Sequence, residues 1–145
     1  MTTQKNEYSY YKVKLRELLR SSFPELASNT KFIEDRSNWA AKAYEGAFMA
    51  GNPVEECDRI ADAILFENLH FSKYDTVFRV VCEEFDTLMA DDDLRPFALK
   101  MLPICKPVFA RYELTENFQD SPEYDRLYSE LTGTIQIFIE QNGLQ

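Results

Sequence analysis

The stretch SKYDTVFRVVCEEFDTL, residues 72–88, decides the fold class. Its apolar side chains recur every three or four residues, which places them on one face of an α-helix. They are Tyr74, Val77, Phe78, Val81, Cys82, Phe85 and Leu88. Asp75 follows Ser72 by three residues, a spacing that is typical of a helix start. We therefore predict an amphipathic helix that begins after Ser72 and is closed by the acidic run Asp91–Asp93.

The same spacing predicts three helices before this one. They run from about Tyr8 to Ser21, from about Lys31 to Ala50, and from about Pro53 to Leu69. The third has the clearest start signal, because Asn52 can cap it, Pro53 suits the first turn and Glu55 can complete a capping box.

The remaining third of the chain is harder to assign. Residues 94–112 are strongly apolar but contain Pro96, Pro103 and Pro107, so we predict either two short helices or one kinked helix, buried. A last helix follows Pro122. Its β-branched segment, residues 134–139, would also suit a strand, but a lone strand would have no partner, so we prefer a helix.

The composition favours a single all-α domain over residues 1–145 with one core. The chain has 145 residues, 45% of them hydrophobic, and only four glycines and six prolines. It contains no internal repeat and no flexible linker. We predict an irregular array of six or seven helices.

Cysteine usage points to the cytoplasm. Cys57, Cys82 and Cys105 are an odd set that contains no CxxC pair or Cys/His cluster, so we expect reduced and mostly buried thiols. No apolar run has the length of a signal peptide or a membrane span, so we expect neither secretion nor a membrane protein.

Catalytic and metal signatures are weak throughout. Glu67 and His70 have the Glu-x-x-His spacing of di-iron bundles, but such sites use that pair twice and His70 is the only histidine. The same lack of histidines argues against triad chemistry, and no glycine-rich phosphate loop occurs. We therefore expect no catalytic, cofactor-binding or metal-binding residues, no cofactor and no enzymatic activity.

One charge pattern is a candidate binding surface. The net charge is −9, yet residues 1–20 carry +3 and the remainder −12. Lys12, Arg16 and Arg20 recur at i, i+4 and i+8, which forms a basic stripe along one side of the first helix. Like charges at this spacing disfavour a helix, so an anionic neighbour would relieve them. That neighbour is either the protein's own carboxylates or an external partner, a protein or a nucleic acid.

Four short motifs occur in an order that resembles an uncharacterised helical family from anaerobic gut and oral bacteria. They are FPEL at 23–26, FIEDR at 32–36, GNPVEE at 51–56 and LHFSKYD at 69–75, preceded by YYKVKLRELLRSS at 10–22. Members of this family, a domain of unknown function, are often encoded near mobile genetic elements. The resemblance implies a multihelical fold and a cytoplasmic bacterial setting, and it assigns no functional residue.

By elimination, we expect a non-enzymatic interaction or accessory protein, linked to a mobile element, that binds a protein partner. The alternative is a nucleic-acid-linked regulator. It would bind DNA through Lys12, Arg16 and Arg20, or would imitate DNA with its acidic surface. The acidic body of the chain disfavours nucleic acid as the ligand of the stripe.

Overall fold

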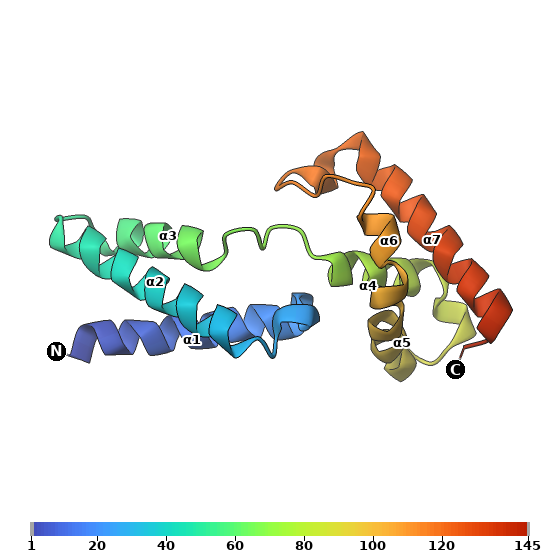
Figure 1. Cartoon of the computed structure of the whole chain (residues 1–145), viewed down its shortest axis with the longest axis horizontal. Helices are drawn as coiled ribbons and strands as arrows, with labels where there is room; N and C mark the ends of the chain where they lie inside the picture. Colours follow the sequence, from blue (N-terminus) through green and yellow to red (C-terminus); the bar gives the residue numbers. More distant parts are fainter. Residues whose placement is uncertain (1, 145) are drawn as a thin grey trace. The chain divides into compact units, whose positions relative to one another are not determined.

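The computed structural model describes residues 2–144, with the side chains of residues 8–144. Lys5 and Glu7, which contribute to the N-terminal charge asymmetry, lie outside the described side chains. The described residues form seven α-helices and three short 3-10 helices, with no strand among them (Figure 1). The all-α prediction is therefore confirmed.

Contacts divide the chain into two compact units, Met1–His70 and Phe71–Gln145. Each unit has its own cluster of buried hydrophobic side chains. The prediction of one core is therefore wrong, because the helices of each unit bury their apolar faces against helices of the same unit. The single domain over residues 1–145 stays a prediction, and each unit is described here by itself.

The first unit consists of α1 (Thr2–Ser22), α2 (Thr30–Met49) and α3 (Val54–Leu65), with the 3-10 turn η1 (Pro24–Leu26) between α1 and α2. Helix α2 packs against both α1 and α3 (Figure 1). The buried core residues are Tyr11, Leu15, Leu19, Phe23, Ile33, Ala40, Ala41, Ala61, Leu65 and Leu69. Small side chains on α2 allow its neighbours to approach closely.

Ser37 is the exception in this apolar surrounding. It lies on the buried face of α2 and is 0% exposed. Its hydroxyl has no hydrogen-bond partner among the described residues. A buried hydroxyl without a partner destabilises the folded state, because it loses its bonds to water and gains none in the protein.

One helix end of the first unit corrects a predicted cap. Asn29 caps α2, since its side-chain oxygen accepts a hydrogen bond from the Phe32 amide at 3.1 Å. Asn52 does not cap α3. Its side-chain amide instead donates to the carbonyl of Ala47 at 2.9 Å and so closes the end of α2. Helix α3 ends at Leu65, four residues before the predicted end.

The second unit consists of α4 (Lys73–Glu84), α5 (Asp91–Ile104), α6 (Lys106–Phe109) and α7 (Pro122–Asn142), with the 3-10 turns η2 (Asp86–Leu88) and η3 (Phe118–Asp120). Helix α4 packs against α5 and α7. The fully buried side chains of this core include Tyr74, Val77, Val80, Phe109, Met101, Leu127, Leu131 and Ile135.

The start of α4 is as predicted, but its end is not. The Ser72 hydroxyl accepts from the Asp75 amide at 2.9 Å, which confirms the cap. The helix stops at Glu84, and Asp91–Asp93 form the first turn of α5 and do not close α4. The partial positive charge at a helix N-terminus favours carboxylates there, which accounts for this placement.

The proline-rich segment forms two helices, one of the two predicted alternatives. Pro96 and Pro103 lie inside α5, and Pro107 opens α6. All three prolines are exposed, so the segment is buried on one side only, which corrects the expectation that it is buried throughout. Helix α7 runs without interruption through residues 134–139, so the strand alternative is wrong.

Candidate functional site

The basic stripe lies beside the buried seam of α1. Tyr11, Leu15 and Leu19 point into the core of the first unit with at most 1% exposure. Each stripe residue directly follows one of them, so Lys12, Arg16 and Arg20 form a row about 100° further round the helix. Lys12 and Arg16 are half-buried and Arg20 is exposed. The structure thus brings the three predicted residues together on one edge of α1.

Neither Lys12 nor Arg16 has a carboxylate partner among the described residues. The Lys12 ammonium lies 5.7 Å from the ring centroid of Tyr8, which is a weak cation–π contact. The described carboxylates of the protein therefore do not neutralise Lys12 or Arg16 by a direct ion pair.

Lys14, on the opposite edge of the buried seam of α1, does pair with a carboxylate of the same unit. Its ammonium lies 2.9 Å from the Asp62 carboxylate of α3, with both side chains about one-third exposed. One turn earlier, the Tyr11 hydroxyl donates to Asp58 of α3 at 3.0 Å. Together these bonds tether α1 to α3.

Two opposing effects act on Lys14. Partial burial lowers its pKa, whereas the hydrogen bond and negative charge of Asp62 raise it, and the net pKa lies above the ordinary value. Lys14 also lies over the rings of Tyr10 and Phe66, at 5.4 and 5.8 Å from their centroids. The sequence pattern gave Lys14 no role. The sequence contains one signal for the internal pairing of Lys14: this residue follows Tyr11 by three positions and lies on the other side of the buried seam from the stripe.

An exposed apolar side chain accompanies the stripe on the outer surface of α1. Val13 is 56% exposed. Val13 follows Lys12 and precedes Arg16 by three residues, so it lies beside the two unpaired cations. The site therefore offers both positive charge and apolar surface, which is a composition that suits a protein partner.

The Glu67–His70 pair does not have the geometry that its spacing suggested. Helix α3 ends at Leu65, so both residues lie beyond it and do not share a helical face. Both are exposed. The Arg36 guanidinium donates to the carbonyls of Leu65 and Glu67 at 3.2 and 2.8 Å, which makes this segment the capped end of α3. Among the described side chains, those of residues 8–144, no three of His, Cys, Asp or Glu lie close enough to hold a metal ion.

The three cysteines form no disulfide in the described part of the chain and are wholly or partly buried. Cys57 and Cys105 are 0% exposed, and Cys82 is partly buried. Burial raises the pKa of Cys105 to about 12, so its thiol stays protonated at neutral pH. A nucleophilic cysteine needs the opposite, a lowered pKa and access to substrate.

Comparison with known proteins assigns the family. Residues 3–144 match the model of a domain of unknown function, DUF1896. The chain belongs to this family. The chain is also similar to protein PG0816 from Porphyromonas gingivalis, whose crystal structure is known. The identity is 39%, the match covers 100% of this chain and 99% of that one, and the TM-score is 0.93. No curated protein matches the sequence.

The match to DUF1896 confirms the family resemblance that the order of the four sequence motifs indicates. It brings no reaction, ligand or partner with it, so the chemistry must be argued from this chain's own residues. Among the described helices of this DUF1896 protein, none is both long enough and apolar enough to cross a membrane.

Proposed function

We propose that this DUF1896 protein is a non-enzymatic interaction protein that binds an acidic surface of another protein through the basic stripe on α1. One observation carries the proposal: Lys12 and Arg16 lack carboxylate partners among the described residues, whereas Lys14 on the same helix has one. Unpaired like charges at i, i+4 spacing cost a few tenths of a kcal/mol per pair, which an acidic partner would recover.

The geometry suits a helix as the bound element. Successive stripe residues are four positions apart, so their Cα atoms rise by about 6 Å per step along α1. Carboxylates at i and i+4 on a partner helix have the same spacing and can meet the stripe in register. Val13 would contribute apolar contact at the centre of that interface.

The family resemblance supports a setting for this activity. We place the protein in the bacterial cytoplasm, as an accessory protein linked to a mobile genetic element. The free cysteines are compatible with that compartment.

Nucleic-acid binding through the same stripe is the second candidate, because a row of cations also attracts phosphates. The charge distribution supports it less well. The first unit has nine Lys and Arg against eleven Asp and Glu, and the second has seven against fourteen, which give net charges of −2 and −7. Both units therefore repel a polyanion at long range. The excess in the second unit would instead favour DNA mimicry.

The test is affinity capture from the native host, with the bound proteins identified by mass spectrometry. Wild type is compared with Lys12→Ala/Arg16→Ala and with Lys42→Ala/Lys106→Ala, a control that removes the same charge from two exposed lysines elsewhere. The proposal expects a protein that wild type and the control retain and the stripe variant loses. A set of bound proteins that is identical for all three chains would refute it.

A parallel measurement addresses the second candidate. Fluorescence anisotropy of a labelled DNA duplex is followed as protein is added at low salt. Binding that falls steeply with salt and disappears in Lys12→Ala/Arg16→Ala would show that the stripe binds nucleic acid and would refute the proposal of a protein partner. The proposal expects no change in anisotropy.

A further inference from the structure

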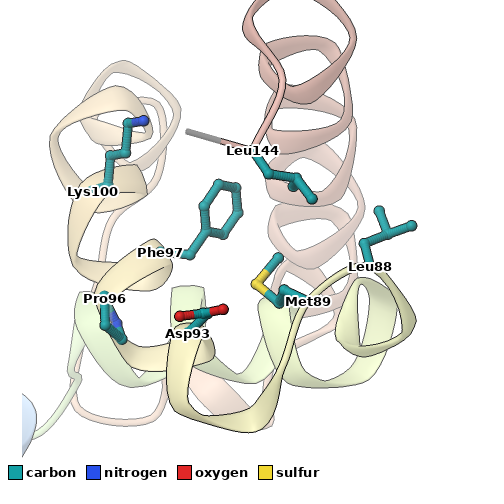
Figure 2. Close-up of a pocket in the computed structure, with 7 residues that line it drawn as sticks. All are labelled: Leu88, Met89, Asp93, Pro96, Phe97, Lys100 and Leu144. Atoms are coloured by element: carbon teal, nitrogen blue, oxygen red, sulfur yellow. The ribbon is translucent and has the colours of Figure 1, made fainter.

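A pocket of about 380 Å³ lies entirely within the second unit (Figure 2). Its lining combines apolar side chains from three segments with one acid and one base. The lining residues are Leu88, Met89, Asp93, Pro96, Phe97, Lys100 and Leu144. This volume is near the lower end of the range of small-molecule sites, which are mostly apolar with a few polar groups.

The walls of the pocket are held by the local backbone. Met89 follows η2 in an extended conformation and leads into α5. Gly143 has φ +73° and ends α7, so that Leu144 leaves the helix axis. Phe97 is only 5% exposed and forms the floor, whereas Leu88 and Leu144 are 48% and 40% exposed. A ligand in the pocket would cover these two leucines.

The two charged lining residues differ in their surroundings. Figure 2 shows Asp93 below the Phe97 ring and Lys100 at the upper left of it. The Lys100 ammonium lies 5.4 Å from the ring centroid of Phe138, so it already has a favourable contact. Asp93 forms no ion pair or side-chain hydrogen bond with any described residue. Neither charge has an ion-pair partner among the described residues, but Lys100 is partly stabilised by its ring contact, so the negative charge of Asp93 is the less compensated of the two.

The neighbouring charges reinforce this sign. Asp91 and Asp92 precede Asp93 in the first turn of α5, and all three are exposed. The helix N-terminus explains why acids are favoured in this turn. It does not explain why Asp93, which lines the pocket, lies next to the buried side chain of Phe97. Of the three, Asp93 alone can contact a ligand seated on Phe97.

We propose that this pocket binds small amphipathic amines. The apolar body of the ligand rests on Phe97 between Leu88 and Leu144, and its ammonium group pairs with the Asp93 carboxylate. This site is separate from the basic stripe, and the inference goes beyond the proposed function.

The test uses three probes of matched apolar body: 2-phenylethylamine, 3-phenylpropionate and 2-phenylethanol. Each is titrated into the 15N-labelled full chain at pH 7, and the amide shifts of Met89, Phe97 and Leu144 are followed by NMR. We expect the amine to bind at least about tenfold more tightly than the carboxylate, the difference that one charge-assisted hydrogen bond supplies. The neutral alcohol should lie between them.

Three variants at exposed positions test which charged side chain pairs with the ammonium group of the ligand. Asp93→Asn should weaken amine binding about fivefold to tenfold. Asp92→Asn, which removes the same charge one residue away, should change it less than about twofold. Lys100→Gln should strengthen amine binding, because it removes a repulsive charge from the lining of the pocket. Circular dichroism confirms the fold of each variant.

Several outcomes would overturn the proposal. They are shifts with none of the three probes, equal affinity for the amine and the carboxylate, or equal effects of Asp92→Asn and Asp93→Asn. Shifts that lie away from the lining residues would place the binding elsewhere and would overturn it as well.

Discussion

Ser37→Ala should make the first unit more stable, although it removes a polar side chain from the protein. Ser37 is 0% exposed on α2, and its hydroxyl has no partner among the described residues. Alanine keeps the β-carbon and deletes only the unsatisfied oxygen. The deletion therefore removes a penalty and leaves a void smaller than a methyl group.

The magnitude follows from two contributions. An unsatisfied buried hydroxyl costs about 1–3 kcal/mol. Alanine is also the better helix former, by about 0.5 kcal/mol relative to serine. Lost packing around the deleted oxygen offsets part of this gain, so we expect a net stabilisation of about 1–2 kcal/mol. For a unit of this size, about 1 kcal/mol corresponds to a rise in Tm of about 4–8 °C.

The chain offers its own probe for this measurement. Trp39 is the only tryptophan and lies on α2, so its fluorescence follows the unfolding of the first unit in urea. Ser9→Ala is the matched control, because Ser9 is an exposed serine in α1. It should gain only the helix-propensity part, about 0.5 kcal/mol. A Ser37→Ala variant that is less stable than wild type, or that gains no more than Ser9→Ala, would refute the reasoning.

Three further predictions concern the backbone, the thiols and one carboxylate. Gly51 has φ +95°, which an alanine adopts only with strain, so Gly51→Ala should lower the free energy of unfolding in urea by about 1–2 kcal/mol. Gly46→Ala, within α2, should raise it, because alanine is the better helix former. In maleimide labelling of the native protein, read by mass spectrometry, the partly buried Cys82 should react first and the two fully buried cysteines only in urea. The hydrogen bond from Tyr128 is the main cause that holds the pKa of Glu83 below its ordinary value of 4.5. A carboxylate with a lowered pKa contributes stability above its ordinary pKa and loses it as the pH falls through the lowered one, so the urea midpoints of wild type and Glu83→Gln should approach each other as the pH falls below 4.5.

The helices themselves were readable from the sequence because their signals are local. The Ser72 cap and the helix that follows it appear in the structure as predicted as far as Glu84. The acidic run Asp91–Asp93 was assigned to the wrong helix, since a run of carboxylates between two helices can lie at the end of one or the start of the next. The helix dipole favours the start, and a prediction that weighed it would have been right.

The sites depend on contacts between segments that are distant in sequence. Three cations of the stripe and Lys14 all lie on α1, and the sequence does not say which of them meets a carboxylate. That depends on the rotation of α1 against α3, which brings Asp62 to Lys14. The pocket likewise joins residues 88–100 with Leu144 at the end of α7, a proximity that no periodicity contains.

If Lys12 and Arg16 bind an acidic protein surface, the dissociation constant of a protein retained in the capture experiment will depend on them. It is measured at two salt concentrations for wild type, Lys12→Ala/Arg16→Ala and Lys42→Ala/Lys106→Ala. We expect the stripe variant to bind about tenfold more weakly at low salt, and its affinity to depend less on salt than that of wild type. Equal dissociation constants for the stripe variant and the control would contradict it.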